Sequence, residues 1–485
     1  MVLSIIALVS LSLALAFGEK EPTVGSSYIA AVYEHHLIVN PNPTIPLSRA
    51  DALKHMQKNL DIYEQQAAIA AKQGAQILVF PEYGLHGFFF SRLSISGYLE
   101  TVPDPQQESW NPCTEPDKHN TEVLQQLSCM ARRNNLYIVA NLPDLQPCPM
   151  KSEPITSCPP DGRWQFNTNV VFSSDGLLVA RYHKQNLFHE QSFDTPPEPE
   201  IITFDTPFAG KFGILTSFDI LFYEPTITLV EKGIRQLIFP TAWLNTPPVT
   251  DSIQFQRAFS LGANVTLLAA NIHFNQFKMT GSGIYTPFSA LYHHAQQGDP
   301  EEGKLLVATV PVLDELLREE EPTPPTGVDA PSSSPPPPTI FAVVPLNGTQ
   351  GELELCNGTF CCHLEYRIQG NSTEFYVFGA VAGLDKEGFT VQACALARCK
   401  RSDIVSCVEG TSEAETKIGF LLKGTFTTKY VYPSLLTSGY VLEPLEHLER
   451  ESDNTVTMKQ STTAGGLVTA CLYGRTYDLD PAKGN

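Results

Sequence analysis

Helical and strand patterns alternate along the first half of the 485-residue chain. Apolar residues recur at three- and four-residue spacing within residues 48–74, and the apolar run ILVF at residues 77–80 follows at once. The same alternation predicts helices near residues 121–134, 225–233 and 252–261, and strands near residues 136–140, 177–182, 212–216, 236–240 and 266–271. Such alternation predicts an α/β layer fold in which both faces of the sheet are covered.

The pattern changes at a proline-rich segment, EEEPTPPTGVDAPSSSPPPPT, at residues 319–339. This composition predicts an extended, semi-rigid linker; a ligand for a proline-binding domain is the alternative. Strand patterns dominate beyond it, near residues 375–381, 389–397, 418–425 and 467–473. We therefore expect an α/β domain over residues 26–318 and a β-rich domain over residues 340–482.

Charge and the chain ends suggest where the protein works. The formal net charge of −20 argues against binding to nucleic acid or to anionic membrane surfaces. Residues 1–18 begin with an uncharged apolar run and predict a signal peptide, with a signal anchor as the alternative. The polar C-terminal tip lacks a GPI signal, so no membrane anchor is expected. The predicted location is secreted and extracellular.

Four N-x-S/T sequons fit this location and predict N-glycosylation. They begin at Asn264, Asn347, Asn357 and Asn371. The apolar residues that follow Asn264 make burial of that site an open alternative.

Eleven cysteines fall into two even sets and one remainder. The first domain holds four, which could form two disulfides, and the second holds six after the linker. The x₄ spacings in the second domain could instead bind zinc in a reducing compartment, and the sequence leaves the pairing open. Cys471 lies in an apolar strand and is the predicted unpaired thiol.

Three polar residues follow predicted strands directly. Glu82 follows ILVFP, Lys184 follows LLVARYH and Ser217 follows FGILT. Taken singly, they could be a helix cap, a surface cation and a small turn residue. Functional groups collect at the carboxyl ends of strands in open α/β sheets, so we expect the three together at the strand ends of one sheet.

The chain resembles the carbon–nitrogen hydrolase (nitrilase) superfamily, and within it the vanin/biotinidase branch. The motifs that carry the resemblance are VFPEYGLHGF, ARYHKQNLF, GKFGILTSFDILF, FPTAW and MTGSGIYTP, with the cysteine-rich segments ELCNGTFCCHL and VQACALARC in the second domain. The resemblance implies a nitrilase-like α-β-β-α sandwich followed by a smaller, disulfide-rich, mostly β domain. It also implies amidase chemistry on a small amide or vitamin-like molecule of the pantetheine or biotin class.

The resemblance further implies a Glu general base at Glu82, a Lys oxyanion stabiliser at Lys184 and a Cys nucleophile at position 217, where this chain has Ser217. A serine hydroxyl needs a stronger base than a lone carboxylate, so we expect hydrolysis to be lost or strongly reduced. An active amidase and a non-catalytic extracellular binding or storage protein are the alternatives. Tyr83, where relatives generally carry Asp, is a second departure. No metal or organic cofactor is implied, because the histidines are scattered and the chemistry needs none.

Overall fold

A computed structural model describes residues 25–148, 158–296, 298–313, 340–370, 372–407 and 409–481. The predicted signal peptide, the proline-rich linker at residues 319–339 and the sequon residue Asn371 lie outside these residues. In the part of the chain that the structure describes, no helix is long and apolar enough to cross a membrane.

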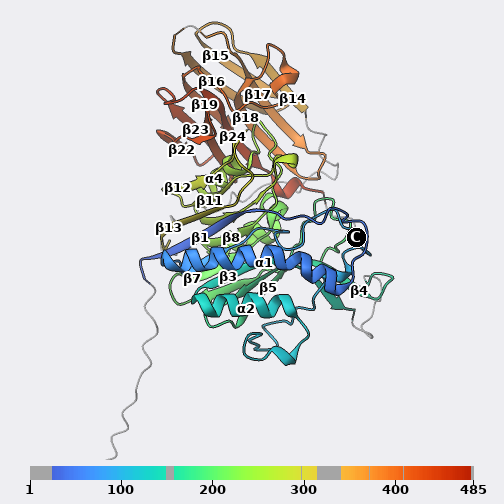
Figure 1. The fold of residues 1–485 in the computed structure, drawn as a ribbon. Helices are drawn as coiled ribbons and strands as arrows, with labels where there is room; N and C mark the ends of the chain where they lie inside the picture. The colour runs from blue at the N-terminus through green and yellow to red at the C-terminus, as the bar shows by residue number, and fades with distance from the viewer. Residues whose placement is uncertain are drawn as a thin grey trace, which may run out of the picture.

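The first domain contains two mixed sheets that pack face to face (Figure 1). The seven-stranded sheet has the order β10-β1-β2-β3-β4-β5, with β13 also paired to β1. Its strands are β1 (Ser27–His36), β2 (Ile77–Val79), β3 (Tyr137–Pro147), β4 (Arg163–Phe172), β5 (Leu178–His183), β10 (Ile272–His273) and β13 (Lys304–Pro311). The central strands β1, β2 and β3 run parallel, which brings their carboxyl ends to one edge.

The six-stranded sheet has the order β12-β11-β9-β8-β7-β6, and its central strands β7, β8 and β9 are also parallel. Its strands are β6 (Thr203–Thr206), β7 (Gly210–Ile214), β8 (Gln236–Pro240), β9 (Thr266–Ala270), β11 (Ser282–Tyr285) and β12 (Ala290–His293). Apolar side chains from both sheets, such as Val32, Val79, Ile238 and Leu268, form the core between them. These strands are apolar on both faces because both faces are covered.

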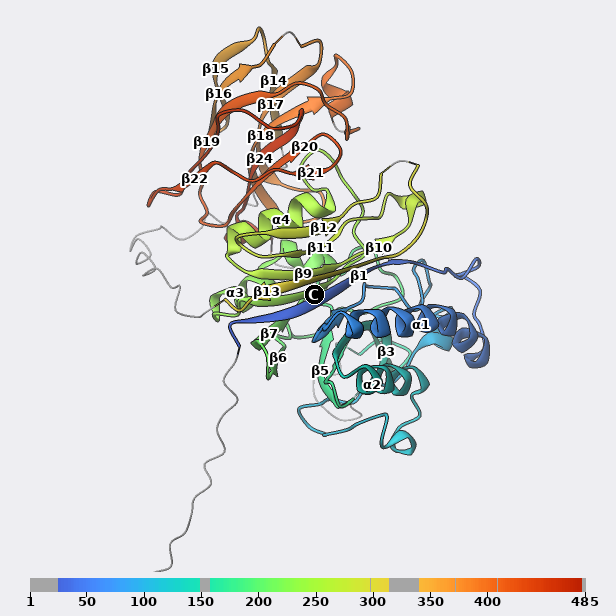
Figure 2. The same cartoon turned by 60° about the vertical axis from the view of Figure 1, so that its left-hand side comes forward.

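Helices α1 (Arg49–Lys72) and α2 (Glu122–Asn134) cover the outer face of the seven-stranded sheet (Figure 2). The start of α1 follows from its cap, because the Ser48 side chain accepts a hydrogen bond from the Asp51 amide. Helices α3 (Thr228–Glu231) and α4 (Ser252–Ala263) pack outside the six-stranded sheet. The predicted helix at residues 225–233 is shorter than expected, since a π-helical turn, Tyr223–Ile227, precedes it.

The second domain is a sandwich of two antiparallel sheets that docks on α4 (Figure 1). One sheet has the order β14-β17-β18-β24-β20-β21, with β14 (Ile340–Pro345), β17 (Phe375–Leu384), β18 (Thr390–Cys399), β20 (Val431–Thr437), β21 (Val441–Leu442) and β24 (Leu467–Arg475). The other has the order β15-β16-β19-β23-β22, with β15 (Gln350–Asn357), β16 (Phe360–Ile368), β19 (Ile418–Thr425), β22 (His447–Arg450) and β23 (Thr455–Gln460). The short single-turn helices are Ser96–Tyr98, Pro116–Lys118, Ser217–Leu221, Asn275–Phe277, Ile404–Cys407 and Tyr477–Leu479.

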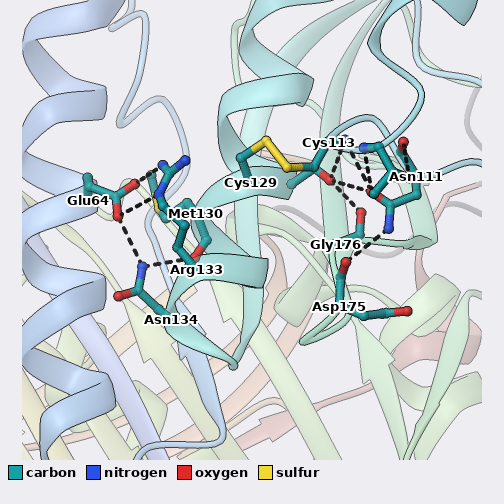
Figure 3. Close-up of a disulfide and its surroundings, with 11 residues drawn as sticks. Glu64, Asn111, Cys113, Cys129, Met130, Arg133, Asn134, Asp175 and Gly176 are labelled. Carbon is teal, nitrogen blue, oxygen red and sulfur yellow. Dashed lines mark hydrogen bonds and ion pairs between the residues drawn. A yellow bond between two sulfur atoms is a disulfide. The ribbon is translucent and has the colours of Figure 1, made fainter.

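Disulfides confirm the expected even sets of cysteines. The bridges among the described residues are Cys113–Cys129, Cys148–Cys158, Cys356–Cys361, Cys362–Cys394 and Cys399–Cys407, and Cys471 is a buried free thiol. Figure 3 shows the first bridge, which ties α2 to the loop that precedes it. In that loop, Asn111 accepts a hydrogen bond from the Cys113 amide and donates one to the Asp175 carbonyl.

Candidate active site

The three residues predicted from strand ends come together, but they do not follow strands of one sheet. Glu82 and Lys184 follow β2 and β5 of the seven-stranded sheet, whereas Ser217 follows β7 of the six-stranded sheet. The expectation of a single sheet is therefore wrong. Because the two sheets pack face to face, their strand ends converge on one cavity that all three side chains line.

Glu82 is a buried carboxylate held at both oxygens. Its Oε1 accepts hydrogen bonds from Lys184 Nζ and Asn167 Nδ2, each at 2.7 Å, and its Oε2 accepts one from the Ala242 amide at 3.1 Å. Burial raises the pKa of Glu82, and the nearby ammonium of Lys184 works in the opposite direction. A carboxylate with a raised pKa is better suited to accept a proton near neutral pH.

Lys184 is shared between two carboxylates. Its ammonium lies 2.7 Å from Glu82 Oε1 and 2.9 Å from Glu190 Oε2, and the side chain is 2% exposed. Burial works against the charged form, but Glu190 and Glu82 hold the pKa of Lys184 above its ordinary value. The ammonium therefore stays charged and can stabilise negative charge that develops beside it.

Ser217 adopts an unusual backbone conformation at the start of a single-turn helix. Its φ of 45° lies in the left-handed region that non-glycine residues rarely adopt. Its Oγ forms a hydrogen bond with Thr241 Oγ1 at 3.0 Å. Among the described residues, no hydrogen bond joins Ser217 to Glu82. Such backbone strain is often found at functional sites, where the surrounding structure holds a reactive group in place.

The histidines nearest in sequence to these motifs do not form a serine-protease type of triad. Both ring nitrogens of His183 are engaged at 2.8 Å, one by Asp144 and the other by Glu200. His86 is buried among the rings of Tyr83 and its aromatic neighbours, and burial lowers its pKa to about 3. An imidazole needs a free nitrogen at the hydroxyl and a pKa near the working pH to serve as its base.

Asp219 is also committed elsewhere, although it lies two residues from Ser217. Its Oδ2 accepts hydrogen bonds from Tyr182 Oη at 2.7 Å and from the Thr216 amide at 3.0 Å. Its Oδ1 accepts two more from Asn186. Asp219 therefore fixes the turn that carries Ser217 and orients no imidazole.

The cavity has a volume of about 710 Å³ and its walls come from both domains. Phe88, Phe188 and Trp243 line it from the first domain, and Phe389 and Lys386 line it from the second. The C-terminal domain therefore forms part of the cavity wall. A mostly apolar wall with a few convergent polar groups is typical of small-molecule sites.

Tyr83 and Glu190 add a polar wall to the cavity. The Tyr83 hydroxyl donates a hydrogen bond to Glu190 Oε1, which also accepts one from Asn167 Nδ2 at 2.7 Å. Glu190 and Thr241 were not predicted as site residues. Glu190 lies six residues after Lys184, just beyond the ARYHKQNLF motif. A carboxylate so close in sequence to a lysine at a strand end was the signal that could have identified Glu190 as a site residue.

The described sequon residues differ in exposure. Asn264 is the C-cap of α4, in a left-handed conformation with φ of 54°. Its side chain is exposed, so burial does not prevent glycosylation at this residue. Asn347 is exposed and Asn357, at the end of β15, is half-buried.

Two facing sheets between helical layers, followed by a mostly β domain with disulfides, define a nitrilase-type α-β-β-α sandwich with a C-terminal extension. Residues 39–280 match the carbon-nitrogen hydrolase family, and residues 336–480 match the vanin C-terminal domain.

Similar proteins carry two names. The chain is 63% identical to the biotinidase of Takifugu rubripes over 487 residues, covering 95% of this chain and 96% of that one. It is 44% identical to the pantetheinase of Sus scrofa over 472 residues, covering 94% and 90%. An amidase from Nesterenkonia sp. AN1 in complex with butyramide is 21% identical, with a TM-score of 0.39 over 59% of this chain and 92% of that one. The chain belongs to the vanin/biotinidase branch of the carbon–nitrogen hydrolases.

Proposed function

We propose that the chain is a vanin/biotinidase-like glycoprotein that keeps an amidase pocket but has lost most or all hydrolysis, because Ser217 occupies the position of the nucleophile. The observation that carries the proposal is the hydrogen bond of Ser217 to another hydroxyl, Thr241 Oγ1, at 3.0 Å. A hydroxyl in that state has no adjoining base to remove its proton.

In an active site of this design, each of the three residues has one role. Glu82 takes the proton of a thiol at position 217, the thiolate attacks the amide carbonyl, and Lys184 stabilises the oxyanion. The amine leaves with the proton returned by Glu82, and a water activated by Glu82 then hydrolyses the acyl group. The buried Lys184–Glu82 contact of 2.7 Å supports these two assignments.

Serine weakens the first step of this sequence most. A thiol is already a few per cent thiolate at neutral pH and is intrinsically very nucleophilic, whereas an alcohol is neither. Serine hydrolases compensate with an imidazole base oriented by a carboxylate. His183 is held between two carboxylates, so it offers no such base to Ser217.

The ligand that we propose is a small amide of the biotinyl or pantetheine class. This rests on relatives named biotinidase and pantetheinase and on a cavity of about 710 Å³ with apolar walls. Phe88, Trp243 and Phe389 would contact the apolar part of such a ligand. The amide carbonyl would face Lys184.

Slow hydrolysis by Ser217 is the second candidate function. The raised pKa of Glu82 favours it, because burial makes this carboxylate a stronger base than a free one. Turnover of a biotinyl amide or of pantetheine by the native chain, measured beside Ser217→Ala, distinguishes lost hydrolysis from slow hydrolysis by Ser217. We expect the same background rate for both proteins. Turnover that disappears in Ser217→Ala would overturn the proposal of lost hydrolysis.

Calorimetry with biotin and with pantetheine tests the retained pocket. We expect heat of binding from one of them and weaker binding in Phe389→Ala, which removes a wall of the cavity. Heat from neither ligand would favour a non-catalytic binding or storage protein with another ligand.

We propose that the chain is secreted and glycosylated, with a signal peptide at residues 1–18, the hydrolase domain at residues 26–318, a linker at residues 319–339 and the vanin-type domain at residues 340–482. Disulfides persist in oxidising compartments, and the bridges in both domains support this. Asn264, Asn347, Asn357 and Asn371 are the proposed glycan sites. Recovery of the chain from culture medium and a mass loss with an N-glycosidase would support it, while retention in the cytosol would contradict it.

A further inference from the structure

Three potential metal ligands meet between the two sheets of the first domain. Glu34 lies on β1, His273 ends β10 and His293 ends β12. Figure 2 shows these strands close together at one side of the hydrolase domain. None of the three residues lines the cavity described above. The histidines are scattered in the sequence, and strand pairing brings them together: His273 lies opposite His36 of β1, and His293 lies opposite Ser282 of β11.

Glu34 is a completely buried carboxylate in a fixed orientation. It continues the inward-facing series of Ala30 and Val32 into the space between the sheets. Its oxygens accept hydrogen bonds from Thr280 Oγ1 at 2.6 Å, the Gly281 amide at 2.9 Å and Ser282 Oγ at 2.7 Å. These bonds orient the carboxylate but bring no positive charge to it, and a buried carboxylate is costly without a cation.

His273 presents a buried nitrogen with no hydrogen-bond partner among the described residues. Its Nε2 lies 3.0 Å from Asn275 Oδ1, an acceptor, so Nε2 carries the proton and Nδ1 carries a lone pair. Nδ1 is buried and unpaired, and it lies 3.6 Å from Glu34 Oε1. A cation between these two atoms would satisfy the unpaired nitrogen and the buried carboxylate together.

His293 completes the group from the side nearest solvent. Its Nε2 lies 3.9 Å from Glu34 Oε1, and its side chain is 26% exposed, so this ligand is in contact with solvent. An imidazole nitrogen in this position is a suitable ligand for a transition-metal ion.

The geometry points to a site for a divalent transition-metal ion, and we propose that Glu34, His273 and His293 bind Zn²⁺ with a fourth position left to water. Two ligand atoms about 2.0–2.1 Å from a tetrahedral zinc are roughly 3.3 Å apart. The two histidine nitrogens lie 3.6 and 3.9 Å from Glu34 Oε1, and all three ligand atoms lie within 4.8 Å of one another, so a small inward shift would bring them to zinc. Two imidazoles disfavour Mg²⁺ and Ca²⁺, which take oxygen ligands. The hydrogen bond from His273 to Asn275 is the outer contact that fixes the tautomer of a ligating histidine.

Metal content of the purified, tag-free full chain tests the proposal. After dialysis against low-micromolar Zn²⁺, we expect about one zinc per chain, and Co²⁺ should give the visible absorption of a four-coordinate site. His273→Ala and His293→Ala should each weaken zinc binding by at least about tenfold. His447→Ala, whose side chain is 54% exposed in the C-terminal domain, is the matched control and should bind zinc like the native chain.

Zinc should also raise the unfolding temperature of the native chain more than that of His293→Ala, since an ion bound only by the folded state stabilises it. If His273→Ala fails to fold, the half-buried His293→Ala carries the test. The proposal is overturned if the native chain binds no stoichiometric zinc, or if His293→Ala binds zinc with native affinity.

Discussion

The hydroxyl of Ser217 lies 3.0 Å from the hydroxyl of Thr241, at the point where the strand ends of the two sheets converge. Neither hydroxyl is a base, so this contact does not prepare Ser217 to attack a carbonyl. Beside it, Glu82, Lys184 and Glu190 form a buried charge cluster in which both carboxylates contact the Lys184 ammonium. In the proposed function, this cluster supplies the supporting groups and Ser217 is the weak nucleophile.

The buried charge cluster predicts unequal effects of removing its members. Glu82→Gln leaves Lys184 paired with Glu190 and loses mainly the bond from the Ala242 amide, so we expect a cost of about 1 kcal/mol in the free energy of unfolding. Lys184→Met leaves two buried carboxylates without a cation and should cost about 3–5 kcal/mol. Guanidinium unfolding of both variants measures the difference. Equal costs would show that the two carboxylates do not share the ammonium.

His183 should make stability depend on pH. Burial disfavours its charged form, but Asp144 and Glu200 outweigh this and raise its pKa above the ordinary value of 6.5. The stabilisation from its charge is therefore complete below about pH 6.5 and is lost as the pH rises through the higher pKa of the folded state. We expect the difference in unfolding free energy between native and His183→Gln to be larger at pH 6 than at pH 9. A difference that grows with pH would contradict this account.

Gly262 is expected to control docking of the two domains. A Cβ at this position would lie 2.7 Å from the Val431 carbonyl oxygen on β20, although alanine by itself favours a helix. Gly262→Ala should destabilise the protein by about 1–3 kcal/mol through overpacking. Gly379→Ala is the control, because its nearest contact would be an ordinary 3.7 Å. Thermal unfolding of both variants measures the effect; stabilisation by Gly262→Ala would show that β20 does not press on α4.

Cys471 should be the thiol that appears on unfolding. It is completely buried on β24, and burial raises its pKa, so the native chain should react very slowly with a thiol reagent. In denaturant without reductant we expect about one reactive thiol per chain, and none in Cys471→Ala. Additional thiols in the unfolded native chain would mean that some disulfides described above are not formed.

The helices of the first domain and its strands β2, β3, β5, β7, β8 and β9 were predictable from apolar patterns, since buried strands are often continuous apolar runs. Strands β1, β4, β6 and β10 to β13 were not predicted. The strand at residues 236–240 has the predicted limits, and α1 starts one residue after its predicted Ser48 cap. The strand predicted at residues 136–140 continues to Pro147. The prediction stopped short because the second half of the strand carries polar residues, which interrupt the apolar run. In that half, Asn141 and Asp144 are buried and contact side chains of β4 and β5, which lie further along the sequence.

The site was predictable only as far as strand ends reveal it. Glu82, Lys184 and Ser217 stand directly after apolar strands, but the division between two sheets depends on pairing that sequence spacing does not encode. Glu190, Asn167 and Thr241 act through side-chain contacts between distant segments. The same limit applies to His273 and His293, whose proximity to Glu34 arises from strand register.

The most direct test of the central claim compares native chain and Ser217→Cys on a biotinyl amide and on pantetheine. If only the nucleophile is deficient, Ser217→Cys should gain activity by orders of magnitude while the native chain stays near background. Ser217→Cys/Glu82→Gln is the matched control and should lose the gain, because the base is absent. Substantial turnover by the native chain, or an inactive Ser217→Cys that is correctly folded, would contradict the account of an intact amidase site that lacks its thiol.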